Sequence, residues 1–223
     1  MRLLVDTTDL DEIREVASWG VCQGVTTNPS LIAKSGRDFK EVADAIFEIL
    51  PDGDISLEVV ATTADEMVAE GLTLLKWQPR AIIKLPMGAE GLKACHRLSA
   101  MGHRVNVTLI FSPSQALLAA RAGAYYVSVF IGRHDDAGMR GMTVVEETAR
   151  IFKHDPSIKS QILAASIRHP EHLLSCALAG AHAGTMPFKV LKQATQHPMT
   201  DIGLASFLRD WEKADAAKKT ALR

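Results

Sequence analysis

The sequence has few cysteines, few aromatic residues and no long apolar run. Only 3 of the 223 residues are cysteines and 5% are aromatic. Cys22, Cys95 and Cys176 lie far apart, with no C-x-x-C pair and no His/Cys cluster. This spacing argues against a disulfide framework and gives no pattern for a structural zinc site. We therefore expect reduced thiols in a reducing compartment, which predicts a cytoplasmic protein.

The chain also lacks an excess of charge of either sign. Lys plus Arg total 25 and Asp plus Glu total 26, and no basic stripe stands out. There is no electrostatic reason to expect a nucleic-acid partner. The short apolar run at the start meets Asp6 too early for a signal peptide, and no apolar stretch is long enough to span a bilayer. We expect no membrane partner.

What is present is an alternation of short apolar runs with longer amphipathic segments. Eight of the runs are rich in β-branched residues, as strands buried on both faces of a parallel sheet are. They are residues 3–6, 24–28, 55–60, 81–86, 105–110, 125–131, 162–166 and 181–185. Eight such repeats without a composition break predict an α/β protein: a single-domain TIM (β/α)8 barrel over residues 1–223.

The competing architecture is an open, doubly wound sheet. Such a sheet usually has fewer strands and often carries a glycine fingerprint after the first one. Here the first strand leads into Asp6-Thr-Thr-Asp9, which contains no glycine. The barrel is favoured.

Helix start signals fill the segments between the runs. Asp9 to Glu12 and Thr63 to Glu66 both have the spacing of a capping box. Pro29, Pro113 and Pro170 each stand where the first residue of a helix is expected.

Two further helices are expected after the eighth strand, near residues 187–194 and over about 200–220. On the last one, Leu204, Phe207, Leu208 and Trp211 follow an i, i+3, i+4, i+7 spacing and form one apolar face. This face either covers the barrel of its own chain or docks on a neighbouring subunit. The pattern alone favours the first.

Polar residues stand near the carboxyl ends of the runs, where a TIM barrel carries its chemistry. In chain order they are Asp6, Asn28, Glu58, Lys84, Thr108, Ser128, Arg133, Ser166, Arg168 and Thr185, with Phe130 among them. Asp6 or Asn28 could simply cap a helix. Glu58 and Lys84 could form a structural ion pair. Lys84 is the hardest to explain in this way, because it is embedded between two apolar residues.

A buried lysine at this position suits imine chemistry. A lysine side chain with its ordinary pKa of about 10.4 is an ammonium ion at neutral pH, whereas burial favours the nucleophilic neutral amine. The amine can condense with a ketone to an iminium, an electron sink for carbon–carbon cleavage. Asp6, Glu58 and Thr108 are candidate proton shuttles. Nearby carboxylates oppose the neutral amine, so at least one must be screened, protonated or held away.

Arg133, Ser166 and Arg168 form a second group after the sixth and seventh strands. Barrel enzymes often bind phosphate in this region, helped by a helix N-terminus. Pro170 marks such a helix start beside Arg168. The alternative is a pair of solvated surface arginines. Together the two groups predict a phosphorylated carbonyl substrate, and iminium chemistry at a lysine needs no metal and no cofactor.

Several motifs resemble the transaldolase family, in order and over the whole chain. The most specific are Gly24-Val-Thr-Thr-Asn-Pro-Ser30 and Val105-Asn-Val-Thr-Leu-Ile-Phe111; others lie at 81–86, 131–133, 164–166, 200–203 and 210–212. The resemblance is closest to the short branch, which holds small transaldolases and fructose-6-phosphate aldolase.

The resemblance implies a role for each candidate residue. Lys84 matches the Schiff-base lysine and Asp6 the acid/base on the first strand. Glu58 and Thr108 match the pair that relays a proton through a water. Thr27, Asn28, Ser128 and Phe130 fall in the substrate-binding set, and Arg133, Ser166 and Arg168 in its phosphate-binding part. The family transfers a dihydroxyacetone unit from a ketose phosphate to an aldose phosphate in the pentose phosphate pathway. Its short members form homo-oligomers of five or ten subunits, with the C-terminal helix reaching a neighbour.

Transaldolase and aldolase activity differ in whether the three-carbon unit is handed to a sugar or released. Aldolase members of the branch typically have Gln, Ala and Tyr where this chain has Glu58, Ser128 and Phe130. The sequence therefore favours transaldolase over fructose-6-phosphate aldolase. A non-catalytic sugar-phosphate-binding barrel is a further alternative, although binding alone does not need a buried lysine.

Overall fold

The computed structural model describes residues 1–221, with side-chain surroundings for 1–33 and 36–215. Its strands are β1 Arg2–Asp6, β2 Cys22–Thr26, β3 Asp54–Glu58, β4 Ile82–Pro86, β5 Val105–Ile110, β6 Tyr126–Phe130, β7 Gln161–Ala165 and β8 Ala183–Met186. The helices are α1 Leu10–Ser18, α2 Pro29–Ser35, α3 Phe39–Ile49, α4 Ala64–Trp77, α5 Ala89–Ala100, α6 Pro113–Arg121, α7 Gly132–Asp136, α8 Met142–His154, α9 Pro170–Leu178, α10 Phe188–Ala194 and α11 Pro198–Ala221.

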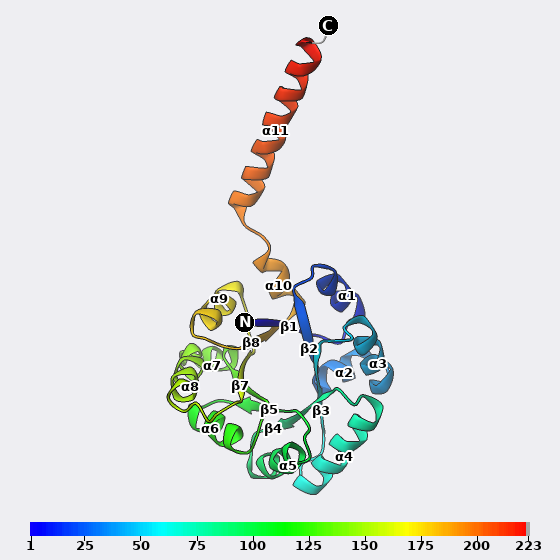
Figure 1. Ribbon diagram of the computed structural model, residues 1–223, viewed down its shortest axis with the longest axis vertical. Helices are drawn as coiled ribbons and strands as arrows, with labels where there is room; N and C mark the ends of the chain where they lie inside the picture. The colour runs from blue at the N-terminus through cyan, green and yellow to red at the C-terminus, as the bar shows by residue number, and fades with distance from the viewer. Residues whose placement is uncertain (222–223) are drawn as a thin grey trace.

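The eight strands close into one parallel barrel in sequence order, with β8 pairing back onto β1 (Figure 1). Helices surround the barrel on the outside. The predicted TIM barrel with an extra C-terminal helix is confirmed. Two connections hold a second helix: α2 and α3 follow β2, and α7 and α8 follow β6.

Every strand except β5 differs from the sequence prediction by one or two residues at one or both ends, and two of these shifts have a clear cause. β2 ends at Thr26, because Asn28 leaves the sheet to cap α2 and its side chain accepts from the Leu31 N–H. β8 begins at Ala183 rather than 181, because the Ala181 N–H still closes α9 on the Cys176 carbonyl. Both shifts have the same cause, because in each case the residue takes part in the hydrogen bonds that end or begin a helix.

The helix starts follow the predicted signals. Asp9 and Thr63 cap α1 and α4 and accept from the backbone N–H of Glu12 and Glu66. At the start of α4 the second bond of the capping box differs from the ordinary one. The Glu66 carboxylate accepts from the Thr63 hydroxyl at 2.7 Å instead of from the Thr63 backbone N–H. The three prolines stand in the first turns of α2, α6 and α9.

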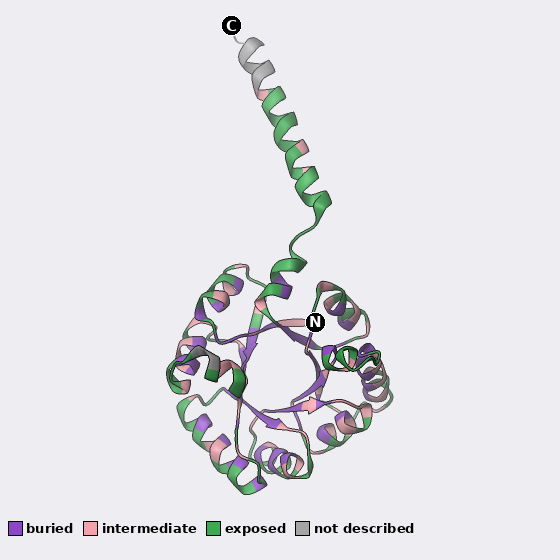
Figure 2. Cartoon of the chain, turned by 180° about the vertical axis from the view of Figure 1, so that it is seen from behind, coloured by how far each residue is buried: buried purple, intermediate pink, exposed green. Residues whose placement is uncertain are grey.

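Buried residues lie on the strands and on the helices around them (Figure 2). Strand alternation divides them into two groups. Outward-facing residues such as Val25, Leu57 and Val107 are fully buried and belong to the main cluster packed beneath the helices. A second, smaller cluster belongs to the barrel interior: Leu4, Ile82, Tyr126, Leu163 and Ala183. This apolar layer separates the two ends of the barrel, so polar residues gather above and below it.

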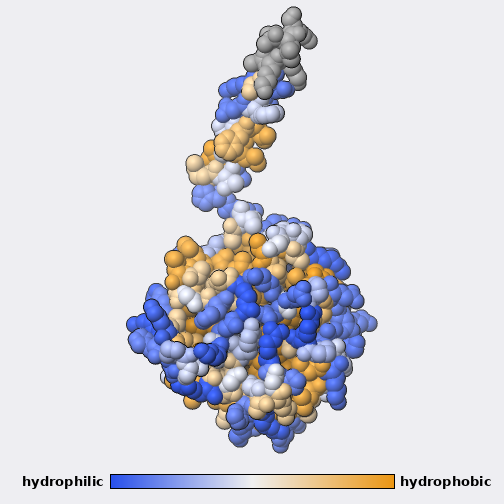
Figure 3. Space-filling model, in the orientation of Figure 1, coloured by the Kyte–Doolittle hydropathy of each residue, from blue (hydrophilic) through white to orange (hydrophobic). Residues whose placement is uncertain are grey.

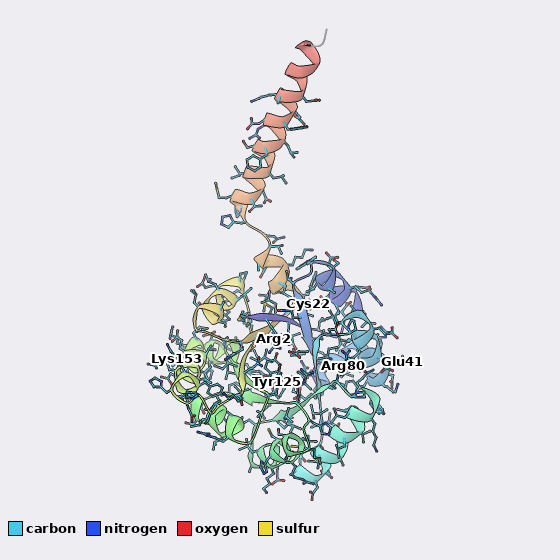
Figure 4. All side chains as sticks on the ribbon, viewed as in Figure 1. Arg2, Cys22, Glu41, Arg80, Tyr125 and Lys153 are labelled. Atoms are coloured by element: carbon cyan, nitrogen blue, oxygen red, sulfur yellow. The ribbon has the colours of Figure 1, made fainter. Side chains whose placement is uncertain are left out.

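The amino-terminal end of the barrel is closed by an ion-pair network around Asp54. Its carboxylate accepts from Arg2 at 2.5 Å, from Arg104 at 2.6 Å and from the Tyr126 hydroxyl at 2.7 Å. Arg2 and Tyr125 lie within the ring of strands in Figure 4. Every oxygen of this buried acid is thus paired, as stability requires.

The last helix stands away from the barrel (Figures 1 and 2). Phe207 is 74% exposed and Trp211 69% exposed, and Leu204 and Leu208 are exposed as well. Figure 3 shows apolar surface on part of the projecting helix. The expectation that this face covers its own barrel is wrong, because α11 extends away from it. No helix within residues 1–221 is both long and apolar enough to cross a membrane.

Candidate active site

A cavity of about 450 Å³ opens at the carboxyl end of the strands. It brings together ten of the eleven site residues predicted from the sequence: Asp6, Asn28, Glu58, Lys84, Thr108, Ser128, Phe130, Arg133, Ser166 and Arg168. Six of them lie on five strands, β1 and β3 to β6, and the other four lie just beyond β2, β6 and β7. The parallel barrel is what makes residues so distant in sequence converge.

Thr27 is the exception. Its hydroxyl donates to the Ser56 carbonyl at 2.9 Å, and its side chain does not line the cavity. Its carbonyl oxygen instead accepts from Lys84 Nζ at 2.9 Å. Thr27 thus takes part in the site through its backbone.

Lys84 lies at the floor of the cavity and is only 7% exposed. Its Nζ is 2.9 Å from Glu58 Oε2, on the neighbouring strand. A buried carboxylate and ammonium at this distance stabilise each other's charge. Of the two carboxylates near the lysine, Glu58 is therefore the one in direct contact with it.

Asp6 is the second carboxylate beside the lysine. Burial raises the pKa of Asp6 above its ordinary value of 3.8, against the opposing effects of the Thr26 hydroxyl and the Lys84 charge. A raised pKa suits a group that must exchange protons during turnover. The two carboxylates are therefore in different environments: Glu58 is ion-paired and Asp6 is desolvated.

A chain of hydroxyls orients Asp6. Thr26 Oγ1 lies 2.7 Å from Asp6 Oδ1 and 2.7 Å from Thr185 Oγ1. Since the Thr26 proton is given to the carboxylate, the Thr185 hydroxyl must donate to Thr26. Both threonines line the cavity. The carboxylate is thus fixed from β2 and β8.

Asn28 lines the cavity while it caps α2. The capping explanation and a substrate-binding role are therefore compatible, because the side chain stands at the edge where the strand passes into the helix.

Thr108 and Ser128 face the cavity from β5 and β6 and are almost fully buried. The Ser128 hydroxyl donates to Asn106 Oδ1 at 2.6 Å, and Asn106 Nδ2 donates to Ser56 Oγ at 3.1 Å. Beyond Thr108, Leu109 has a φ of 60° at a shift in the β5–β6 register. A left-handed non-glycine residue costs about 1 kcal/mol or more and often marks a functional site.

The far end of the cavity carries two arginines. The Arg133 guanidinium lies over the Phe130 ring, 5.0 Å from its centroid, and Phe130 packs against Phe111 at 5.3 Å. Ser166 has a φ of 58°, the second left-handed non-glycine residue beside this cavity. This end combines two positive groups with a hydroxyl, which is the donor set that a phosphate prefers.

Arg168 crosses the first turn of α7 to reach Asp136, whose Oδ2 lies 2.7 Å from Arg168 Nη2. This path requires a glycine. A Cβ on Gly132 would lie 2.6 Å from both Cγ and Nε of Arg168 and 2.4 Å from the Ser166 carbonyl oxygen. Gly132 therefore lets the turn that bears Ser166 and Arg168 approach α7 closely.

The sequence profile of the family described as "Transaldolase/Fructose-6-phosphate aldolase" matches residues 3–221 of this chain. The chain belongs to the transaldolase/fructose-6-phosphate aldolase family. The resemblance seen in the sequence motifs is confirmed.

Curated relatives cover almost the whole chain. The probable transaldolase of Caldicellulosiruptor saccharolyticus is 55% identical over 213 residues, 96% of this chain and 98% of that protein. The probable transaldolase of Herpetosiphon aurantiacus is 54% identical over 218 residues, 97% and 98% of the two chains. The probable transaldolase of Symbiobacterium thermophilum is 55% identical over 214 residues, with coverage of 96% and 98%.

In this transaldolase-family barrel, sequence reasoning missed several residues of the site. Thr26 ends β2, two positions before Asn28, and Asn106 stands two positions before Thr108 on the same face of β5. That two-residue period was the available signal for both. Thr185 was noted only as the end of the eighth strand, and its contact with Thr26 joins residues 159 positions apart. Nothing in the local sequence indicates that contact.

Proposed function

We propose that this chain is a transaldolase. It transfers a dihydroxyacetone unit from a ketose phosphate, fructose 6-phosphate or sedoheptulose 7-phosphate, to an aldose phosphate. The observation that carries this is the buried Lys84 amine at the cavity floor, 2.9 Å from the Glu58 carboxylate and within the field of Asp6. A lysine with proton acceptors at hand is what Schiff-base chemistry needs.

The reaction begins with a proton transfer. Glu58 takes a proton from the Lys84 ammonium, and the neutral amine attacks the C2 carbonyl of the ketose. The carbinolamine loses water, with protons moved by Glu58 and Thr108 through a water molecule, and an iminium forms. Asp6 then removes the proton of the C4 hydroxyl, the C3–C4 bond breaks, and its electrons enter the iminium to give an enamine.

Transfer runs the same steps backwards with a second sugar. The enamine attacks the aldehyde carbon of the acceptor while Asp6 returns its proton to the new hydroxyl. Hydrolysis of the iminium frees Lys84. Asn28 and Ser128 hydrogen-bond hydroxyls of the bound unit, and Thr27 holds the Lys84 amine through its carbonyl oxygen.

The phosphate of either sugar binds to Arg133, Arg168 and the Ser166 hydroxyl. These groups line the same cavity as Lys84. Arg168 turns from Asp136 to the phosphate, because an exposed ion pair is worth little and a phosphate offers stronger, two-pronged bonding.

Fructose-6-phosphate aldolase is the second candidate. Glu58, Ser128 and Phe130 favour transfer, because the Phe130 ring brings no hydroxyl that could protonate the enamine and release the three-carbon unit. Three relatives above 50% identity, each named a probable transaldolase, support the same choice.

Product analysis decides between the two. Purified protein is incubated with fructose 6-phosphate, with and without erythrose 4-phosphate. We expect sedoheptulose 7-phosphate and glyceraldehyde 3-phosphate only when the acceptor is present. Free dihydroxyacetone formed without an acceptor would make the protein an aldolase.

The proposal extends to assembly and place of action. A homo-oligomer of five or ten subunits accounts for α11, whose apolar face is exposed in the single chain. The chain acts in the cytoplasm, in the pentose phosphate pathway, and its partners are sugar phosphates rather than nucleic acid or membrane. No cofactor or metal enters the proposed reaction.

A further inference from the structure

The turn between β7 and α9, residues 166–169, carries both Ser166 and Arg168. It is fastened at two points. The Gly132 N–H of α7 donates to the Ser166 carbonyl at 2.9 Å, and the Arg168 N–H donates to His172 Nδ1 at 3.3 Å. Because Ser166 is left-handed, the turn keeps its shape only if its neighbours hold it.

His172 is the third residue of α9 and forms, with His169, a variant of the capping box in which the return bond goes to the Arg168 N–H rather than to the N–H of the N-cap. His169, the N-cap, accepts the His172 N–H on its Nδ1 at 3.3 Å, and His172 reaches back to the Arg168 N–H. A capping box ordinarily uses Ser or Thr with Glu or Gln. The His172 ring is buried and lies 3.8 Å from the His169 ring, centroid to centroid.

The tautomer of His172 follows from these bonds. Since Nδ1 accepts from the backbone, the ring proton of the neutral imidazole is on Nε2. Nε2 lies 3.0 Å from Asp135 Oδ2 and donates to it. Asp135 belongs to α7, two residues after Arg133, and its other oxygen accepts the Gly141 N–H at 2.9 Å. The helix that bears one phosphate arginine is thereby tied to the turn that bears the other.

We propose that His172 and Asp135 are positioning residues for the phosphate end of the substrate. They hold Ser166 and Arg168 in register with Arg133, so that the three groups meet one phosphoryl group. This inference rests on the proposed function, since it deepens the assignment of the phosphate site. Neither residue lines the cavity, so both act through the turn.

The arrangement is sensitive to pH. Burial lowers the pKa of His172 below its ordinary 6.5, reinforced by His169 and Arg168 and opposed by the Asp135 carboxylate. His172 is therefore neutral at physiological pH. A second proton could go only to Nδ1, which would then no longer accept from the Arg168 N–H. Acid conditions thus break the hydrogen bond from the Arg168 N–H to His172, one of the two that hold the turn.

The test compares His172→Leu with His172→Gln. Leucine removes both hydrogen bonds, whereas glutamine, the ordinary capping-box residue, can accept and donate without titrating. With fructose 6-phosphate we expect His172→Leu to raise KM by about 5- to 10-fold with kcat within about 2-fold, the loss expected for one or two hydrogen bonds. With unphosphorylated fructose neither parameter should change. His172→Gln should restore KM at neutral pH and remove its rise at acid pH.

Asp135→Asn gives a second, independent variant. The amide can donate to Nε2 and so permits the tautomer that cannot accept from Arg168, which should raise KM for fructose 6-phosphate in the same selective way. It also keeps the test open if His172→Leu fails to fold. Equal loss on phosphorylated and unphosphorylated donors, or no change in KM, would overturn the inference. Absence of activity in the parent protein would instead count against the proposed function.

Discussion

Glu58 and Lys84 are register partners on β3 and β4, and their side chains meet 2.9 Å apart over the same barrel floor. Adjacent parallel strands place residues of equal register on the same face, so the contact is a direct result of how β3 and β4 pair. It puts the proton acceptor at the amine before any substrate arrives.

Lys84→Met should abolish turnover and covalent trapping. With fructose 6-phosphate and borohydride, mass spectrometry should find the reduced adduct on the parent and none on the variant. The exposed Lys93→Met, which loses only a surface pair with Glu90, should trap normally. Activity that survives in Lys84→Met would contradict the Schiff-base mechanism, and a parent that never traps would favour the non-catalytic barrel.

The same variant should be less stable, because it leaves Glu58 as a buried, unpaired charge. We expect a loss of roughly 3 kcal/mol in the free energy of unfolding, measured in urea. Adding Glu58→Gln should recover part of this stability but none of the activity. If Lys84→Met alone were as stable as the parent, the Glu58–Lys84 ion pair would have to be well solvated.

Asp6→Asn should inactivate the protein yet stabilise it at neutral pH. Burial raises the pKa of Asp6, so between 3.8 and the folded-state pKa the native state binds more protons than the unfolded state. Stability contributed by Asp6 therefore falls as pH rises through that window. The gain in unfolding free energy from Asp6→Asn should be largest above the folded-state pKa of Asp6. It should become smaller as the pH falls towards 3.8. Urea midpoints across pH test this, with the exposed Asp52→Asn as the control.

Phe130→Tyr should shift the reaction from transfer towards release. The added hydroxyl enters the cavity beside the enamine and can supply a proton, so the ratio of free dihydroxyacetone to sedoheptulose 7-phosphate should rise roughly 10-fold or more. Quantifying both products by chromatography provides the ratio. An unchanged ratio would mean that the residue at position 130 does not determine whether the three-carbon unit is transferred or released.

Gly132→Ala should weaken substrate binding. The new Cβ would clash with the Ser166 carbonyl and the Arg168 side chain, which must move. We expect a loss of about 1–3 kcal/mol in stability and a raised KM for fructose 6-phosphate. Gly203→Ala on α11 is the matched control, because its Cβ meets nothing within 4 Å and the helix favours alanine. A normal KM in Gly132→Ala would argue that the position of Arg168 is unimportant.

Replacing Phe207 and Trp211 together with serine should break the assembly. Light scattering after size exclusion should show a ring of subunits for the parent and smaller species for the variant, since the apolar face of α11 is what a neighbour would bury. Arg209→Ser, also exposed on α11, should keep the parent mass. A monomeric parent would contradict the proposed oligomer.

The sequence by itself determined the barrel and most of the cavity. Eight β-branched runs separated by amphipathic segments leave few ways to bury both faces of a sheet, and a parallel barrel gathers the ends of its strands. Lys84, Glu58 and Thr108 could therefore be assigned to one site from their places in the runs. Local rules also predicted where α1, α2, α4, α6 and α9 begin, because a cap needs only residues within one turn.

Only the tertiary structure decided which side chains touch. Thr27 and Thr26 are neighbours in sequence, yet Thr26 lines the cavity and Thr27 turns its hydroxyl to Ser56. The His172–Asp135 bond joins two connections of the barrel that share no sequence pattern. The amphipathic pattern of α11 predicted an apolar face, but not that the face would be left exposed. Periodicity records which way a residue faces along its own element, whereas contacts depend on what the rest of the chain brings opposite it.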